Sequence, residues 1–155
     1  MEKKIILSPL DGVLLPLEDV PDPVFAQKIV GDGVAINPSS QTVFSPIDGI
    51  VSAVVKGGHA LALKDKDGLE ILIHIGIDTV KLKGEGFNCL VKEGQKVERG
   101  DKLIEFNIER IKMAGLPLIS PIVLITHTYR LICPTPYGSE LKALESPIFE
   151  IQPIF

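Results

Sequence analysis

Short aliphatic runs recur along the whole chain, and no other feature limits its fold as strongly. Each run is bounded by Gly, Pro, Asp or Ser, and no long stretch repeats with the period of about 3.6 residues that marks an amphipathic helix. The runs cover residues 5–7, 13–15, 34–36, 50–55, 60–63, 70–75, 102–106, 122–126 and 148–151. The sequence therefore predicts an all-β fold, a sandwich or a barrel, with short helical turns at 24–29 and 108–113.

The start of the chain is echoed further along. The segment Ser8-Pro9-Leu10-Asp11-Gly12 resembles Ser45-Pro46-Ile47-Asp48-Gly49, and Ser-Pro-Ile returns at 120–122 and 146–148. Proline ahead of an aliphatic run marks the start or the edge of a strand. The echo predicts a duplicated strand unit inside one domain, and a chain of 155 residues is expected to form a single domain spanning 1–155.

One segment, residues 91–103, resembles the hairpin of biotinyl and lipoyl carrier domains. Gly94 and Gly100 are expected to set its bends, with Val97 and Leu103 pointing inward. A carrier lysine would precede such a hairpin, whereas Lys112 follows it. The resemblance therefore indicates a fold and not a swinging-arm carrier.

The charge pattern argues against several classes of partner. The net charge is −4 and lysine and arginine form no cluster, so neither nucleic acid nor an anionic membrane is expected to bind. The apolar stretch at 5–7 is too short for a signal peptide or a membrane span, which predicts a cytoplasmic protein. Cys89 and Cys133 share no metal-ligand spacing and are expected to be reduced, buried thiols.

Two of the three histidines, His59 and His74, lie on neighbouring runs joined by the turn at 64–68. A four-residue loop would place His59 directly opposite His74, whereas a two-residue Asp67-Gly68 turn would make the two rings diagonal neighbours. Both alignments put the rings on one face. Two titratable rings held this close are a candidate reaction centre, although a structural histidine pair remains an alternative. The third histidine, His127, is expected at the surface.

Both alignments also divide the neighbouring side chains between two faces. The face of the histidines would carry Leu61, Leu63, Glu70 and Leu72. The other face, which reads as core, would carry Ala60, Ala62, Ile71, Ile73 and Ile75.

Six stretches, in their order and spacing, resemble enzyme IIA of the glucose type, the phosphocarrier of the bacterial phosphoenolpyruvate–sugar phosphotransferase system. They are residues 24–36, 45–49, 58–61, 74–80, 83–87 and 93–97. The resemblance covers roughly residues 5–126. It implies a flattened antiparallel β-sandwich or barrel with a shallow active-site depression.

The resemblance also implies the chemistry. His74 would accept a phosphoryl group from phospho-HPr and pass it to a cysteine on a IIB domain of another chain, for sugar uptake and phosphorylation, with His59 as the accessory histidine. The backbone carbonyl of Gly76 would hold the second ring nitrogen of His74 and so fix its tautomer. The family usually has threonine two residues before the accessory histidine, where its hydroxyl orients the ring. Here that residue is Gly57.

Family members seat HPr on an apolar ring and pair acidic residues with a basic residue of the donor. The acidic positions correspond to Asp22 and Asp78. Phenylalanine is common at the positions of Val55 and Leu72, so partner choice can differ. The apolar rim corresponds to Val24, Phe25, Val30, Val55, Leu72 and Val80.

Two rival functions use the same histidines. Zinc could bind at His59 and His74, although no cofactor is expected to be obligatory. Zinc peptidases of related architecture need a His-x-His pair, and Gly76 occupies the second position here. A purely regulatory module, docking to other protein targets according to its phosphorylation state, is the other alternative.

Overall fold

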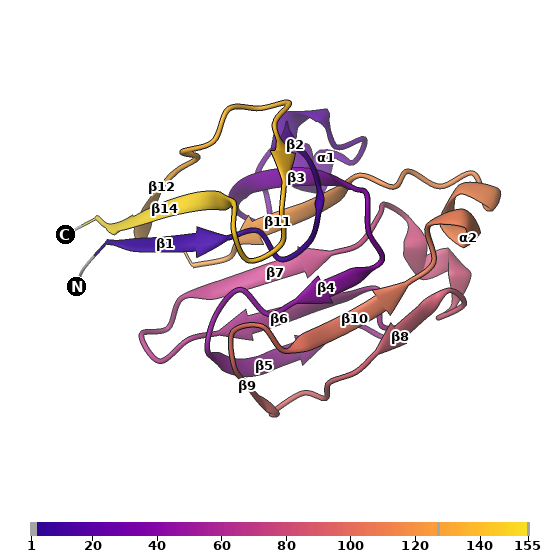
Figure 1. Cartoon of the computed structure of the whole chain (residues 1–155), viewed down its shortest axis with the longest axis horizontal. Helices are drawn as coiled ribbons and strands as arrows, with labels where there is room; N and C mark the ends of the chain where they lie inside the picture. Colours follow the sequence, from indigo (N-terminus) through magenta and orange to yellow (C-terminus); the bar gives the residue numbers. More distant parts are fainter. Residues whose placement is uncertain (1–2, 127, 155) are drawn as a thin grey trace.

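The computed structural model describes residues 3–126 and 128–154, so His127 lies outside the described residues. Its strands are antiparallel throughout the described pairings and form three sheets, with few and short helices (Figure 1). The predicted all-β fold is confirmed. The elements, in which η denotes a 3-10 helix, are β1 (Lys4–Leu7), β2 (Gly12–Pro16), η1 (Leu17–Asp19), α1 (Pro23–Ala26), β3 (Asp32–Pro38), β4 (Thr42–Phe44), β5 (Gly49–Val54), β6 (Ala60–Lys64), β7 (Glu70–His74), η2 (Thr79–Leu82), β8 (Phe87–Cys89), β9 (Lys96–Val97), β10 (Lys102–Phe106), α2 (Ile108–Met113), β11 (Ser120–Leu124), β12 (Tyr129–Ile132), β13 (Glu140–Leu141) and β14 (Pro147–Pro153).

The strand order reveals two copies of one unit. The large sheet runs β13-β2-β3-β11-β7-β6-β5-β9, and the two small sheets run β1-β14-β12 and β4-β10-β8. Strands β4–β10 form one copy. Strands β1–β3 together with β11–β14 form the other, and each pairing in one copy has its counterpart in the other. The two copies meet where β11 pairs with β7.

The repeated Ser-Pro segments follow the first strand of each copy and form the same hydrogen bond. The Ser8 hydroxyl donates to the Leu10 carbonyl at 2.6 Å, and the Ser45 hydroxyl donates to the Ile47 carbonyl at 2.7 Å. The duplication expected from the sequence is therefore present in detail.

Two apolar clusters lie inside the molecule. The larger one fills the space between the sheets and includes residues of both copies. The smaller one gathers Leu17, Val20 and Phe25 against Ala35, Ile77 and Val123. The smaller cluster supports the segment of chain that carries the histidine site described below.

Local sequence explains the two short helices. Asp22 precedes α1 and accepts a hydrogen bond from the Val24 N–H at 3.0 Å, and Pro23 occupies the first helical position. Asn107 caps α2 through the Arg110 N–H, also at 3.0 Å. Both helical turns were predicted from the sequence, and α2 has the predicted bounds.

The segment 91–103 bends as expected. Gly94 and Gly100 have φ of 86° and 97°, and Val97 and Leu103 are buried in the larger cluster. The two strands do not pair with each other as in a simple hairpin, because β9 pairs with β5 and β10 with β4 and β8.

The register of β6 against β7 differs from both alignments that we expected. Ala60 lies opposite His74, and Lys64 opposite Glu70. The loop has three residues, since the Asp65 N–H donates to the Leu69 carbonyl at 2.9 Å and Gly68 has φ of 86°. Three-residue hairpin loops place glycine in this left-handed conformation. The expected two- and four-residue loops were wrong by one residue in either direction.

A shift of one residue exchanges the two faces of a strand. Leu61 and Leu63 are fully buried in the larger core cluster, so the expectation that they flank the histidines is wrong. Ala60 shares a face with His74, and Ala62 follows on that face, so their predicted place in the core face is also wrong.

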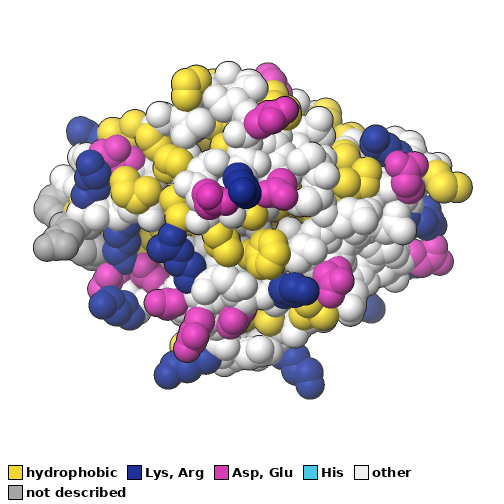
Figure 2. Space-filling model, in the orientation of Figure 1, with side chains coloured by type: hydrophobic (Ala, Val, Ile, Leu, Met, Phe, Trp, Pro, Cys, Tyr) yellow, Lys and Arg dark blue, Asp and Glu magenta, His cyan; other side chains and the backbone are white. Residues whose placement is uncertain are grey.

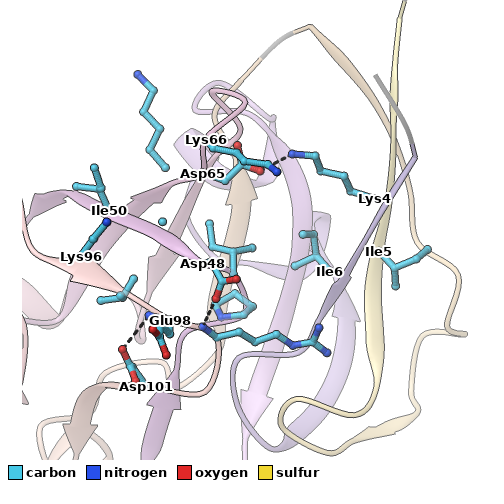
Figure 3. A pocket seen from close by; sticks show the side chains of 16 residues that line it. Lys4, Ile5, Ile6, Asp48, Ile50, Asp65, Lys66, Lys96, Glu98 and Asp101 are labelled. Carbon is cyan, nitrogen blue, oxygen red and sulfur yellow. Dashed lines mark hydrogen bonds and ion pairs between the residues drawn. The ribbon is translucent and has the colours of Figure 1, made fainter.

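Figure 3 shows an open groove, with a volume of about 1080 Å³, next to Asp65 and Lys66. These residues belong to the turn of the β6–β7 hairpin, whereas His74 is at the other end of β7. The groove is lined by β1, by the turn around Asp65 and by the segments 46–50 and 96–101. Five lysine and arginine side chains and four carboxylates line it, and Lys4 bonds to Asp65. With charges of both signs in near balance, the groove has no marked preference for an anion or a cation.

The visible surface is mixed in character. Figure 2 shows basic, acidic and apolar side chains interspersed, without a large patch of one charge sign. Cys89 and Cys133 are free, as expected, but half-buried and not fully buried. No helix in the described ranges is long and apolar enough to cross a membrane.

Candidate active site

The His74 ring is held by a hydrogen bond to the backbone of the loop that follows it. His74 is the last residue of β7, and its Nδ1 lies 2.7 Å from the Gly76 carbonyl oxygen. A carbonyl can only accept a hydrogen bond, so Nδ1 must carry the proton. In the neutral ring Nε2 then keeps its lone pair. His74 is half-buried, which leaves part of the ring open to a partner.

His59 lies against His74. The ring centroids are 5.0 Å apart with an interplanar angle of 78°, and the His59 side chain is almost fully buried. In a regular ladder the two rings would be on opposite faces, because His59 stands opposite Ile75, whose N–H donates to the His59 carbonyl at 2.8 Å. The rings meet because His59 precedes β6, where a turn through Gly57 and Gly58, with φ of 103° and 80°, redirects the backbone.

A phenylalanine ring packs against each of the two histidines. Phe25 of α1 packs on His74 with ring centroids 5.2 Å apart, and Phe87 of β8 lies 6.1 Å from His59. Phe25 was among the rim residues expected from the sequence. Phe87 was not, although it ends the quoted stretch 83–87; its position after two glycines gave no sign that it would face His59.

Burial keeps both imidazoles neutral. Loss of hydration, together with a smaller effect of charge on the nearby His74, lowers the pKa of His59 to about 4. Burial also lowers the pKa of His74, although the hydrogen bond to Gly76 and the charges of Asp22 and Asp78 oppose this shift. At neutral pH both rings are therefore uncharged, and Nε2 of His74 can act as a nucleophile.

The expected rim residues fall into two groups. Val24, Val55 and Val80 are exposed, with 44%, 38% and 56% of their surface accessible. Phe25 is buried, and Val30 and Leu72 pack against the same small cluster as Phe25.

The two acidic residues near His74, Asp22 and Asp78, each lie just before a short helix. Asp22 caps α1, and Asp78 precedes η2 in a left-handed conformation with φ of 60°. The Asp78 carboxylate lies 3.8 Å from the Lys81 ammonium and remains largely exposed. Both carboxylates act on the charge state of His74, so both belong to its surroundings.

Gly57 occupies the position where the resemblance implies a threonine, and the structure shows the space around it. A Cβ built on Gly57 would lie 3.4 Å from Nδ1 of His59, so a side chain here would face that ring. The φ of 103° strains any L-residue other than glycine. The ring of His59 is thus held by its packing against His74 and Phe87.

Among the residues that the structure covers, no three His, Cys, Asp or Glu side chains gather into a metal site. His59 and His74 alone would supply at most two nitrogens to an ion. Structural zinc takes four protein ligands and catalytic zinc three.

The chain resembles known proteins over most of its length. A family model described as phosphoenolpyruvate-dependent sugar phosphotransferase system, EIIA 1, matches residues 4–129. The glucose-specific EIIA component of Bacillus cereus is 49% identical over 126 residues, covering 81% of this chain and 76% of the relative. That of Haemophilus influenzae is 39% identical over 147 residues, covering 95% and 88%.

The fold matches as well. The solved structure of glucose permease IIA from Mycoplasma capricolum superposes with a TM-score of 0.88 at 34% identity, covering 97% of this chain and 96% of that one. Sequence and fold thus agree with the resemblance seen in the six stretches. The chain belongs to the EIIA 1 family of the phosphoenolpyruvate-dependent sugar phosphotransferase system, whose members are phosphocarriers between HPr and a IIB domain.

Proposed function

We propose that His74 is the residue of this phosphocarrier that carries the phosphoryl group. The observation that supports this most directly is the 2.7 Å contact between Nδ1 and the Gly76 carbonyl, which leaves the Nε2 lone pair free. Nε2 attacks the phosphorus of phospho-HPr. A new N–P bond forms as the N–P bond of the donor breaks, and the donor histidine leaves with the electron pair. The thiolate of the IIB cysteine then attacks the phosphorus, and a new S–P bond forms as the N–P bond at His74 breaks and the imidazole leaves with the electron pair.

His59 is proposed to stabilise the phosphoryl group. A neutral imidazole still has one N–H, and a ring 5.0 Å from His74 can donate it to a phosphoryl oxygen. The low pKa of His59 fits this role, because a neutral donor does not hold the phosphoryl group too tightly for onward transfer. Phe25 and Phe87 limit access of water to the labile N–P bond.

The exposed valines Val24, Val55 and Val80 are proposed to seat HPr, with Asp22 and Asp78 attracting its cationic side chains. The acceptor is proposed to be a IIB domain, in keeping with the role of the family. The proposed setting is the cytoplasm, where the family exchanges phosphoryl groups.

Neither rival function has a specific observation in its favour. Zinc bound at His59 and His74 would need further ligands from water or another protein, since no third candidate ligand joins them in the described part of the chain. We therefore propose a carrier without an obligatory cofactor. Metal analysis of protein purified without an affinity tag tests this, and stoichiometric zinc would contradict it.

The test of the carrier role uses phosphoenolpyruvate, enzyme I and HPr, followed by mass mapping of the modified residue. His74→Gln is expected to abolish phosphorylation, because the nucleophilic nitrogen is lost. His59→Gln is expected to accept the phosphoryl group but to donate it poorly to IIB. A label that persists in His74→Gln would refute the assignment.

A further inference from the structure

Behind Gly76 lies a buried hydroxyl that the chemistry above does not use. Ser120, the first residue of β11, has no exposed surface. Its hydroxyl oxygen accepts a hydrogen bond from the Gly76 N–H at 3.0 Å and donates to the Leu118 carbonyl at 2.9 Å. The direction of both bonds is fixed, because an amide only donates and a carbonyl only accepts.

The peptide group before Gly76 is held at both ends. Its carbonyl, that of Ile75, accepts from the Thr79 hydroxyl at 2.6 Å, and its N–H, that of Gly76, donates to Ser120. A peptide group is planar, so fixing both ends fixes its orientation.

The next peptide group is held in the same way. Its carbonyl, that of Gly76, accepts from His74, and its N–H, that of Ile77, donates to the Pro117 carbonyl at 3.0 Å. The segment 117–120 thus binds the loop after His74 through two hydrogen bonds, one at Pro117 and one at Ser120. The carbonyl that selects the tautomer of His74 has little freedom to turn away.

The loop leaves little room for a substitute partner. A Cβ built on Gly76, whose φ is 69°, would lie 2.7 Å from Thr79 Cγ2 and 2.9 Å from the Pro117 oxygen. Gly76 is buried, so removing the Ser120 hydroxyl would leave its N–H without a partner in a packed interior. The loop would have to shift to recover a hydrogen bond, and the Gly76 carbonyl would shift with it.

We propose that Ser120 is a positioning residue for phosphoryl acceptance. By holding the Gly76 N–H it aims the Gly76 carbonyl at Nδ1 of His74, which keeps the Nε2 lone pair available. Ser120 itself takes no part in the transfer of phosphorus. The inference rests on the proposed role of His74.

Two measurements test it on the whole chain. Long-range ¹H–¹⁵N NMR of the unphosphorylated protein reports the tautomer of His74, and rapid-quench kinetics with phospho-HPr report the rate of phosphorylation. Ser120→Ala is expected to populate both tautomers and to slow phosphorylation roughly tenfold, as loss of an outer-shell partner does at metal-bound histidines. Ser120→Thr keeps the hydroxyl and is expected to restore both properties.

Another buried serine offers a matched control. Ser45 is also fully buried and donates its hydroxyl proton to a backbone carbonyl at 2.7 Å, but it lies next to the segment 46–50 that lines the groove away from the histidines. Ser45→Ala removes a comparable bond and is expected to change neither the tautomer nor the rate. If Ser120→Ala does not fold, Ser120→Cys, which keeps the size and weakens the acceptor, takes its place.

The inference is overturned if Ser120→Ala or Ser120→Cys shifts the tautomer of His74 no more than Ser45→Ala does. It is also overturned if the tautomer shifts but phosphorylation is not slower, or if a folded Ser120→Thr does not restore both the tautomer and the rate. The tautomer measurement needs no phosphoryl donor. It therefore separates a failure of this inference from a failure of the proposed role of His74, which the His74→Gln label decides.

Discussion

At the scale of single residues, two similar imidazoles have different surroundings. His74 has a hydrogen-bonded Nδ1 and two carboxylates that favour its charged form, whereas His59 is buried against two aromatic rings. Burial without a compensating charge explains why the pKa of His59 falls to about 4. Residue type alone could not distinguish the two roles; the surroundings do.

The pKa of His59 has a consequence for stability. In the unfolded chain this ring takes up a proton as the pH falls through about 6.5, whereas in the folded protein it stays neutral down to about 4. Because the unfolded state binds more protons in this window, acid favours unfolding. The contribution of His59 is intact above pH 6.5 and is lost towards pH 4, by about 3 kcal/mol in all.

Urea unfolding at a series of pH values checks this expectation. His59→Gln removes the titrating group, so its free energy of unfolding should depend less steeply on pH between 4 and 6.5. Equal pH slopes in His59→Gln and the unaltered protein would contradict the buried, neutral state of His59.

At the scale of elements, the β6–β7 hairpin places His74 at one end and a highly bonded turn at the other. Asp65 accepts hydrogen bonds from the N–H groups of Asp67 and Leu69, both at 2.9 Å, and binds Lys4. These bonds hold the three-residue loop, and the loop fixes which residue lies opposite His74.

Asp65→Ala is therefore expected to destabilise the protein by about 1–2 kcal/mol through two unpaired N–H groups and a lost ion pair. Asp67→Ala is the matched control. Asp67 binds the same lysine at 2.7 Å from a more exposed position, so its loss should destabilise the protein less than the loss of Asp65. Thermal unfolding measures both, and equal losses would show that the turn bonds of Asp65 contribute little.

The hairpin also marks the limit of what the sequence reveals. Each aliphatic run listed from the sequence coincides with a strand of the structure, since burial and turn chemistry are local properties. The alignment of β6 with β7 depended on whether Asp65 would bond the N–H groups of the turn, which spacing does not reveal. The nearness of His59 and His74 was nevertheless anticipated, because both expected alignments put the two rings on one face, although the rings meet through the turn at Gly57 and Gly58. The contact of Phe87 and the hydroxyl of Ser120 come from distant strands and left no local signal.

At the scale of the whole molecule, charges of both signs are interspersed over the visible surface, and two nearby carboxylates act on the pKa of His74. Asp22 and Asp78 are the carboxylates that raise its pKa, against a net charge of −4 for the chain. If they also attract a cationic donor, their effect belongs to the approach of the two proteins and should weaken with salt.

The double variant Asp22→Asn with Asp78→Asn tests this. Asparagine still caps a helix, so α1 should persist. The second-order rate constant for phosphorylation by phospho-HPr is expected to fall several-fold at low salt and to approach that of the unaltered protein at high salt. The pKa of His74, followed by NMR, should fall. Glu98→Gln in the distant groove is the control and should leave the rate unchanged; a comparable loss there would point to net charge as the cause.

The seam between β7 and β11 ties the two copies into one working unit. The copy formed by β4–β10 contains both histidines. The hydrogen bonds that hold the loop after His74 come from the other copy, from Pro117 just before β11 and from Ser120 on that strand. Without the other copy, strands β4–β10 would keep both imidazoles but lose the hydrogen bonds that hold the Gly76 carbonyl against Nδ1 of His74. If the chain is divided between α2 and Pro117, the fragment with the histidines should be phosphorylated on His74 only when the fragment with Pro117 and Ser120 is added.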